Sequence, residues 1–209
     1  MQRFPRTATN IIAALTAAAW LIALALGQSD RAAYALGFIP ARFSLPSTPF
    51  PAVPAFLTPL TATLVHGGLI HLGFNLLIFV WCGAMVERVL GAVGLVVMYV
   101  VGAYAAAAAQ FFASPHAIVP VIGASGAISA VIGAYALSFG RARAFTSNLR
   151  LNRWINVAWL MVSWLVLQLM MGWLGNQQGF LLATPAHVGG FAAGLLLQRP
   201  LLLWHYRKA

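Results

Sequence analysis

Three long stretches of this chain contain no aspartate, glutamate, lysine or arginine: residues 43–86, 89–140 and 154–198. Over the whole chain 62% of the residues are hydrophobic and 7% are charged, whereas about 25% of a typical soluble domain is charged. A helix of about 20 apolar residues crosses a bilayer, so the second and third stretches each have room for two crossings. The sequence therefore predicts an all-α integral membrane protein.

Turn signals and charges divide the apolar sequence into six predicted transmembrane helices. Clusters of proline, glycine and polar residues interrupt the second and third stretches. The predicted helices are residues 11–26, 69–86, 89–111, 125–139, 154–173 and 187–204. We expect one membrane domain over residues 1–209, with a short cytoplasmic tail at residues 1–10 and a long extracytoplasmic first loop at residues 27–66.

The positions of the basic residues predict how these helices are oriented. With a cytoplasmic N-terminus, 10 of the 12 lysine and arginine residues lie on the cytoplasmic side, in agreement with the positive-inside rule. Both termini are then cytoplasmic. We attribute the net charge of +10 to this topology and not to nucleic-acid binding. We expect no nucleic-acid partner, because no basic run alternates with aromatic residues.

The first apolar segment has an alternative interpretation as a cleaved signal peptide. Arg3 and Arg6 precede it, and small residues lie near its end. Cleavage would leave five spans with their basic loops on the outer side. An uncleaved first span agrees better with the distribution of charge.

A serine lies between glycines at the start of the fourth predicted helix, in the sequence Gly123-Ala124-Ser125-Gly126. A serine hydroxyl becomes a nucleophile when a neutral imidazole takes its proton. The glycines allow a sharp turn into the helix, and the free N–H groups at a helix start favour a developing oxyanion. Gly-x-Ser-Gly also serves helix packing in membranes, so Ser125 is a candidate for either role.

A histidine opens the sixth predicted helix. An ionisable side chain within a membrane span is costly and usually functional. Gly190 and Gly194 follow His187 on the same helical face, where they allow another helix to approach closely. Docking this face on the small residues of the fourth helix would bring His187 to Ser125. The alternative is a histidine that is only hydrogen-bonded within the bundle.

His71 and Asn75 are one helical turn apart, so both project from one face of the second predicted helix. An imidazole and an amide are suitable donors to the oxyanion of a tetrahedral intermediate. Metal binding fits poorly, because His66 and His71 would point about 140° apart on a helix and no carboxylate is near. We expect no metal or cofactor, and we expect His66 to order the entrance loop by hydrogen bonding.

The chain contains two acidic residues, Asp30 and Glu87. A pair of intramembrane aspartates and a His-Glu-x-x-His zinc site are therefore excluded. Glu87 ends the second predicted helix, too far from Asn75 to orient His187, and nothing places Asp30 beside it. A Ser/His dyad is the economical interpretation.

Three segments together resemble the signature of the rhomboid intramembrane serine proteases. They are the segment from His66 to Asn75, the segment Gly123-Ala124-Ser125-Gly126, and His187 with Gly190 and Gly194. Their order and spacing agree with the family over residues 61–197. The resemblance implies a six-transmembrane-helix rhomboid bundle, with a lateral gate at its second and fifth helices. It also implies a Ser125/His187 dyad and an oxyanion site formed by His71, Asn75 and the backbone N–H of Ser125.

Two positions depart from the family pattern. Many bacterial members have a tyrosine four residues after the nucleophile, stacked on the catalytic histidine, whereas this chain has Ser129. The Trp-Arg pair of the first loop is also missing, with Leu57 and Thr58 in the corresponding neighbourhood. These departures concern how His187 is held and how the first loop is anchored.

We expect an intramembrane serine endopeptidase of the bacterial inner membrane that cleaves transmembrane protein substrates near their extracytoplasmic ends. Its partners would be those substrates and membrane lipid. One alternative is a catalytically inactive rhomboid-like adaptor that binds transmembrane helices, against which the presence of both Ser125 and His187 argues. A channel or transporter would need charged residues or inverted repeats at mid-membrane, which the sequence lacks.

Overall fold

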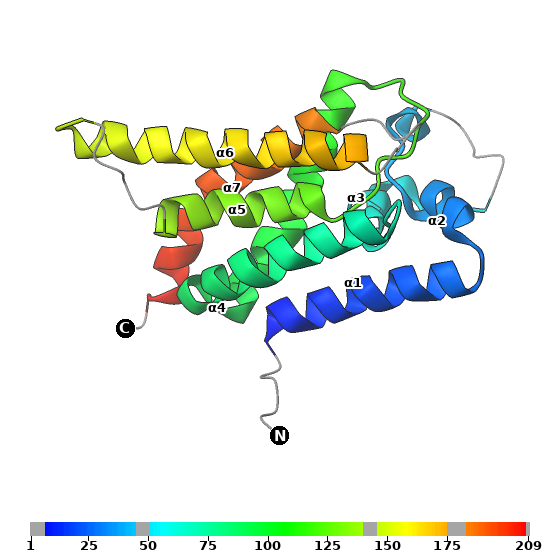
Figure 1. Cartoon of the computed structure of the whole chain (residues 1–209), viewed down its shortest axis with the longest axis horizontal. Coiled ribbons are helices and arrows are strands. Elements are labelled where there is room, and N and C mark those ends of the chain that lie inside the picture. Colours follow the sequence, from blue (N-terminus) through cyan, green and yellow to red (C-terminus); the bar gives the residue numbers. More distant parts are fainter. Residues whose placement is uncertain (1–6, 45–50, 140–145, 175–182, 208–209) are drawn as a thin grey trace.

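The computed structural model describes residues 7–44, 51–139, 146–174 and 183–207 (Figure 1). Within these ranges the regular secondary structure is helical, and the only β feature is an isolated antiparallel bridge between Phe38 and Val121. The all-helical class predicted from the apolar stretches is confirmed.

Seven α-helices and three short 3-10 helices follow one another along the described chain. The α-helices are α1 (Ala8–Ala25), α2 (Ser29–Leu36), α3 (Thr58–Thr61), α4 (Leu69–Ala113), α5 (Ser125–Phe139), α6 (Leu149–Leu174) and α7 (Thr184–His205). The 3-10 helices are η1 (Pro40–Phe43), η2 (Ala55–Leu57) and η3 (Ala62–Leu64). The predicted first loop therefore contains α2, α3 and the 3-10 helices.

The boundary predicted between the second and third spans was wrong. We expected a break at the charged pair Glu87-Arg88, but α4 continues past this pair and bends at Gly91, whose φ of 72° and ψ of 168° are not helical. A positive φ is readily available to glycine, whereas a charged pair does not interrupt the backbone hydrogen bonds of a helix. A Cβ at this position would also lie 2.7 Å from the His205 ring of α7.

Three helices among the described residues are long and apolar enough to cross a membrane: α1, α4, and α6 over Leu149–Met170. The helix α5 is apolar but shorter, with 15 residues. The chain is thus an all-helical protein with membrane-spanning helices, and the number of six spans stays a prediction.

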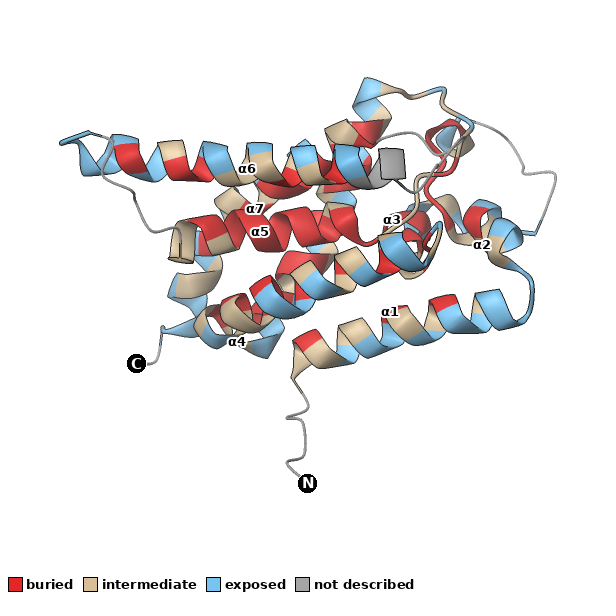
Figure 2. Cartoon of the chain, in the orientation of Figure 1, coloured by how far each residue is buried: buried red, intermediate tan, exposed pale blue. Residues whose placement is uncertain are grey.

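The helices α4, α5 and α7 pack closely on one another, with α1 against α4 and α6 against α5 and α7. Figure 1 shows α1, the first part of α4, α5 and α6 in successive rows. Burial follows this arrangement, because most of α5 is buried whereas α1 and α6 are exposed along much of their length (Figure 2). Because α5 lies at the centre of this arrangement, most of the residues that follow Ser125 in this helix are buried.

Glycines allow α5 and α7 to approach to backbone contact. A Cβ on Gly190 would fall on the carbonyl oxygen of Gly126, and a Cβ on Gly194 would fall on that of Ala130. From the other side, a Cβ on Gly133 would meet the carbonyl oxygen of Phe191. Helices in lipid associate by such close packing because burial of apolar surface gives little driving force there.

The carboxylate of Glu87 ties the beginning of α1 to α4. It accepts hydrogen bonds from the backbone N–H groups of Ala8 and Thr9, at 2.8 and 3.0 Å, and from the Thr9 hydroxyl at 2.6 Å. A carboxylate at a helix N-terminus satisfies free N–H groups and interacts favourably with the helix dipole. One of the two acidic residues of the chain thus serves helix capping.

Adding a methyl group at the helix contact should destabilise the fold. Gly194→Ala places its Cβ on backbone atoms of Ala130, which cannot rotate away, so we expect a loss of about 1–3 kcal/mol in the free energy of unfolding, as for other overpacked interiors. Gly73→Ala is the matched control, because nothing lies within 4 Å of a Cβ there. Thermal unfolding in detergent measures both, and equal melting temperatures for the two variants would contradict this account of the contact.

Candidate active site

The segment before α5 is held against the turn before α4. The backbone N–H of Gly123 donates to the Ala62 carbonyl at 3.0 Å, and that of Ala124 donates to His66 Nε2 at 3.4 Å. The indole of Trp20 in α1 donates to the His66 carbonyl at 3.0 Å. His66, expected to order the entrance loop, therefore joins three parts of the chain just before Ser125.

His66 is a neutral acceptor in this position. Burial lowers the pKa of His66 to about 3, and the nearby His71 ring contributes in the same direction. The two rings meet edge to face, with centroids 5.0 Å apart. Protonation of His66 would remove the acceptor of the Ala124 N–H, so the low pKa preserves the turn that leads into α5.

The structure brings Ser125 and His187 together. Ser125 begins α5 and His187 lies in the first turn of α7; the hydroxyl oxygen of Ser125 is 2.9 Å from His187 Nε2. Both side chains are buried, with exposed fractions of 7% and 6%. The distance suits proton transfer from a serine hydroxyl to a neutral imidazole.

His187 Nδ1 is buried and has no hydrogen-bond partner among the described residues. The carboxylate of Glu87 binds the beginning of α1, and Asp30 lines a separate cavity of about 130 Å³ together with Trp20 and His66. Within the described ranges, the pair of Ser125 and His187 is thus not extended by a carboxylate.

His71 and Asn75 converge on Gly123, two residues before Ser125. Gly123 has a φ of 109°, which favours glycine, and a Cβ there would lie 2.8 Å from His71 Nε2 and 3.6 Å from Asn75 Nδ2. Asn75 is 1% exposed, and its Nδ2 lacks a partner among the described residues. A buried amide donor left unpaired costs stability and is free to bind an acceptor that enters the site.

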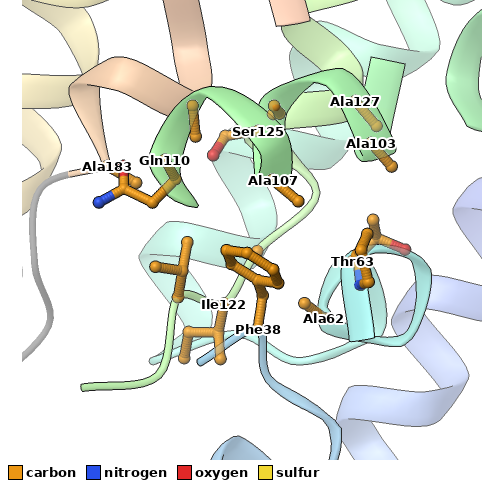
Figure 3. Close-up of a pocket in the computed structure, with 16 residues that line it drawn as sticks. Phe38, Ala62, Thr63, Ala103, Ala107, Gln110, Ile122, Ser125, Ala127 and Ala183 are labelled. Atoms are coloured by element: carbon orange, nitrogen blue, oxygen red, sulfur yellow. The ribbon is translucent and has the colours of Figure 1, made fainter. Parts of the chain in front are cut away.

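A small cavity of about 40 Å³ lies beside Ser125 (Figure 3). Its lining is mostly apolar and includes several alanines of α4 and α5 with Phe38 of the first loop, and Gln110 adds an amide. Phe38 and Gln110 were missed by the sequence analysis, because they reach the site only through long-range packing. The space beside the hydroxyl fits a small side chain.

Two further residues at the site were also missed as partners. The Ser129 hydroxyl donates to the Ser125 carbonyl and accepts from the Trp164 indole N–H, each at 2.7 Å. The Trp164 ring meets the His187 ring edge-on, with centroids 6.3 Å apart. Ser129 was recognised as a departure from the family pattern but not as a partner of Trp164, and no local spacing singles out Trp164 among the tryptophans of α6.

The described residues contain no group of three or more His, Cys, Asp or Glu side chains that could hold a metal ion.

The fold and the site define an all-helical integral membrane protein with a buried serine–histidine pair between two of its helices. A family model for the rhomboid domain matches residues 55–204, and no curated protein matches the chain. The chain therefore belongs to the rhomboid family, as the sequence motifs predicted. Members of this family are typically intramembrane serine proteases, and inactive members exist.

Acidification is expected to destabilise the fold through His66. Its pKa of about 3 in the folded chain is lower than the value of about 6.5 in an unfolded chain, so unfolding takes up a proton between these two values. The free energy of unfolding should fall as the pH drops below about 6.5, by up to about 1.4 kcal/mol per pH unit for this group.

Melting temperatures in detergent at about pH 7 and about pH 5 measure this effect. His66→Gln should lose less stability on acidification than the wild type. His116→Gln, which removes an exposed imidazole, should lose as much as the wild type. The same pH dependence in all three proteins would show that His66 does not carry the effect.

Proposed function

We propose that this chain is an intramembrane serine endopeptidase that cleaves transmembrane protein substrates with a Ser125/His187 dyad. The observation that carries the proposal is the distance of 2.9 Å between the Ser125 hydroxyl and His187 Nε2 in a buried site. A structural histidine would need no open space beside its partner, whereas a hydrolase needs room for substrate. The cavity of about 40 Å³ next to Ser125 would take a small substrate side chain beside the hydroxyl.

In the proposed reaction, His187 Nε2 takes the proton of Ser125 as the oxygen attacks the scissile carbonyl carbon. The backbone N–H of Ser125 and the side chains of His71 and Asn75 stabilise the oxyanion. The imidazolium then gives its proton to the leaving amine, and an acyl ester remains on Ser125. Water, deprotonated by His187, hydrolyses this ester and restores the hydroxyl.

The same proposal includes a topology. Six spans result if α4 is counted as two helices divided at Gly91, and the charge distribution then favours cytoplasmic termini in a bacterial inner membrane. Ser125 and His187 each lie in the first turn of their helix, which this orientation places toward the extracytoplasmic side. With this topology, we expect cleavage near the extracytoplasmic end of a transmembrane substrate.

A lateral route for substrate is supported by the first part of α4. An apolar groove there is lined by residues that include Leu77, Val80 and Trp81, and Trp81 contacts Tyr135 of α5 with ring centroids 6.0 Å apart. The helix α6 packs on α5 and α7. We propose that transmembrane substrates enter between α4 and α6.

A fluorophosphonate probe tests the dyad, because it reacts with an activated serine without requiring a known substrate. The purified protein in detergent should label covalently. Ser125→Ala should abolish labelling, and His187→Ala should lower its rate by about 10³-fold or more, since loss of either member disables the unit. Ser147→Ala, which removes an exposed serine just before α6, should label like the wild type.

Two results would contradict the proposal. A folded wild-type protein that does not label would favour an inactive member that binds transmembrane helices. Labelling of Ser125→Ala at the normal rate would place the reactive group elsewhere.

Asn75→Ala tests the oxyanion site. Loss of one oxyanion donor typically lowers the rate by about 10²-fold, so we expect a reduction of that size in the maximal labelling rate, with little change in probe affinity. Asn156→Ala is the matched control, because it removes a buried amide of α6 that donates to the Asn152 carbonyl. An unchanged rate in Asn75→Ala would assign Asn75 to packing.

A further inference from the structure

Among the residues that the structure describes, the imidazole of His187 has one hydrogen-bond partner. Its Nε2 faces the Ser125 hydroxyl, and its Nδ1 has no partner among the described residues. A catalytic imidazole is usually oriented by a hydrogen bond at its second nitrogen. With only one such bond, the ring needs another contact to keep Nε2 directed at the serine.

Trp164 of α6 provides a contact of this kind. Its indole is 3% exposed, and it meets the His187 ring in a T-shaped arrangement, with the planes inclined by 74°. Aromatic pairs of this geometry are mutually stabilising beyond the area they bury. The indole therefore packs against one side of the imidazole and limits its rotation.

The indole is itself held by Ser129. The Trp164 N–H donates to the Ser129 hydroxyl, which donates in turn to the Ser125 carbonyl, both at 2.7 Å. Ser129 is 0% exposed, and these two bonds use its hydroxyl proton and one of its two acceptor lone pairs. These two bonds link the indole to the backbone carbonyl of Ser125, which lies one helical turn before Ser129 in α5.

We propose that Trp164 is a positioning residue for the dyad: it holds the His187 imidazole toward Ser125 by ring contact and is itself fixed by its hydrogen bond to Ser129. The inference rests on the proposed serine protease function. Because Trp164 belongs to α6, the orientation of the imidazole then depends on where α6 lies against α5 and α7.

Saturation kinetics with a fluorophosphonate probe test the role of Trp164, because they separate the maximal labelling rate from probe affinity. Misplacement of a catalytic group by about 1 Å costs about 10²-fold in rate. We expect Trp164→Ala to lower the maximal rate by about 10-fold to 100-fold, with the affinity unchanged. Trp159→Ala, which removes an exposed tryptophan from the same helix, should keep the wild-type rate.

A second set of variants keeps the test valid if Trp164→Ala does not fold. Trp164→Phe and Ser129→Ala each break the link between the indole and the Ser125 carbonyl. Both should lower the maximal rate, and the double variant should lose no more than the slower single variant, because residues of one network are not additive. Melting temperatures in detergent identify variants that are unfolded.

Three results would overturn the inference. The first is a folded Trp164→Ala protein that labels at the wild-type rate, and the second is full additivity of Trp164→Phe and Ser129→Ala. The third is a folded wild-type protein that does not label, which refutes the protease proposal and the role of Trp164 together. The first two leave the protease proposal intact, so the two failures are distinguishable.

Discussion

The backbone contact between α5 and α7 is the constraint on which the site depends. Gly190 packs on the carbonyl of Gly126, and Gly194 packs on that of Ala130. Gly126 directly follows Ser125, and Gly190 lies three residues after His187. A shift of one helix along the other would therefore change both the glycine contacts and the distance from the serine hydroxyl to the imidazole. The geometry of the pair follows from helix packing, and helix packing here leaves little freedom.

Polar contacts complete what close packing begins. In lipid, apolar surface gives little preference for one helix neighbour over another, whereas hydrogen bonds between helices do. Glu87 joins α4 to α1, the amide of Gln198 in α7 donates to Ser138 of α5 at 3.1 Å, and Trp164 joins α6 to α5. Each of these bonds connects a different helix to the central group of α4 and α5.

The sequence predicts well those features that depend on local composition and on the spacing of residues along one helix. The charge-free stretches predict the helices, and the spacing of His187, Gly190 and Gly194 predicts one face that can dock on α5. The bend of α4 was misplaced because the visible signal, Glu87-Arg88, is a charge signal, whereas the bend requires the positive φ of Gly91. Glu87 also has a role that its position in sequence does not indicate, since its partners Ala8 and Thr9 are nearly 80 residues away.

Long-range pairs account for the rest of what the sequence leaves open. Ser129 and Trp164 are 35 residues apart, on helices that meet only when the bundle forms, and no periodicity relates them. The absence of a tyrosine at position 129 was visible in the sequence, but the residue that contacts His187 instead was not. Such a pair can be identified only when the structure shows which helices pack on α5.

The proposed role of Trp164 agrees with the scarcity of acidic residues in this chain. Orienting a buried imidazole with a carboxylate would place a charge in a low-dielectric interior, where desolvation is costly. This chain has Asp30 and Glu87 as its acidic residues, and Glu87 serves α1 at the opposite end of the first part of α4. An indole carries no charge, so it can constrain the imidazole without that cost. The pair of Ser125 and His187 is thus compatible with an almost uncharged membrane interior, provided that the ring of His187 is held by packing.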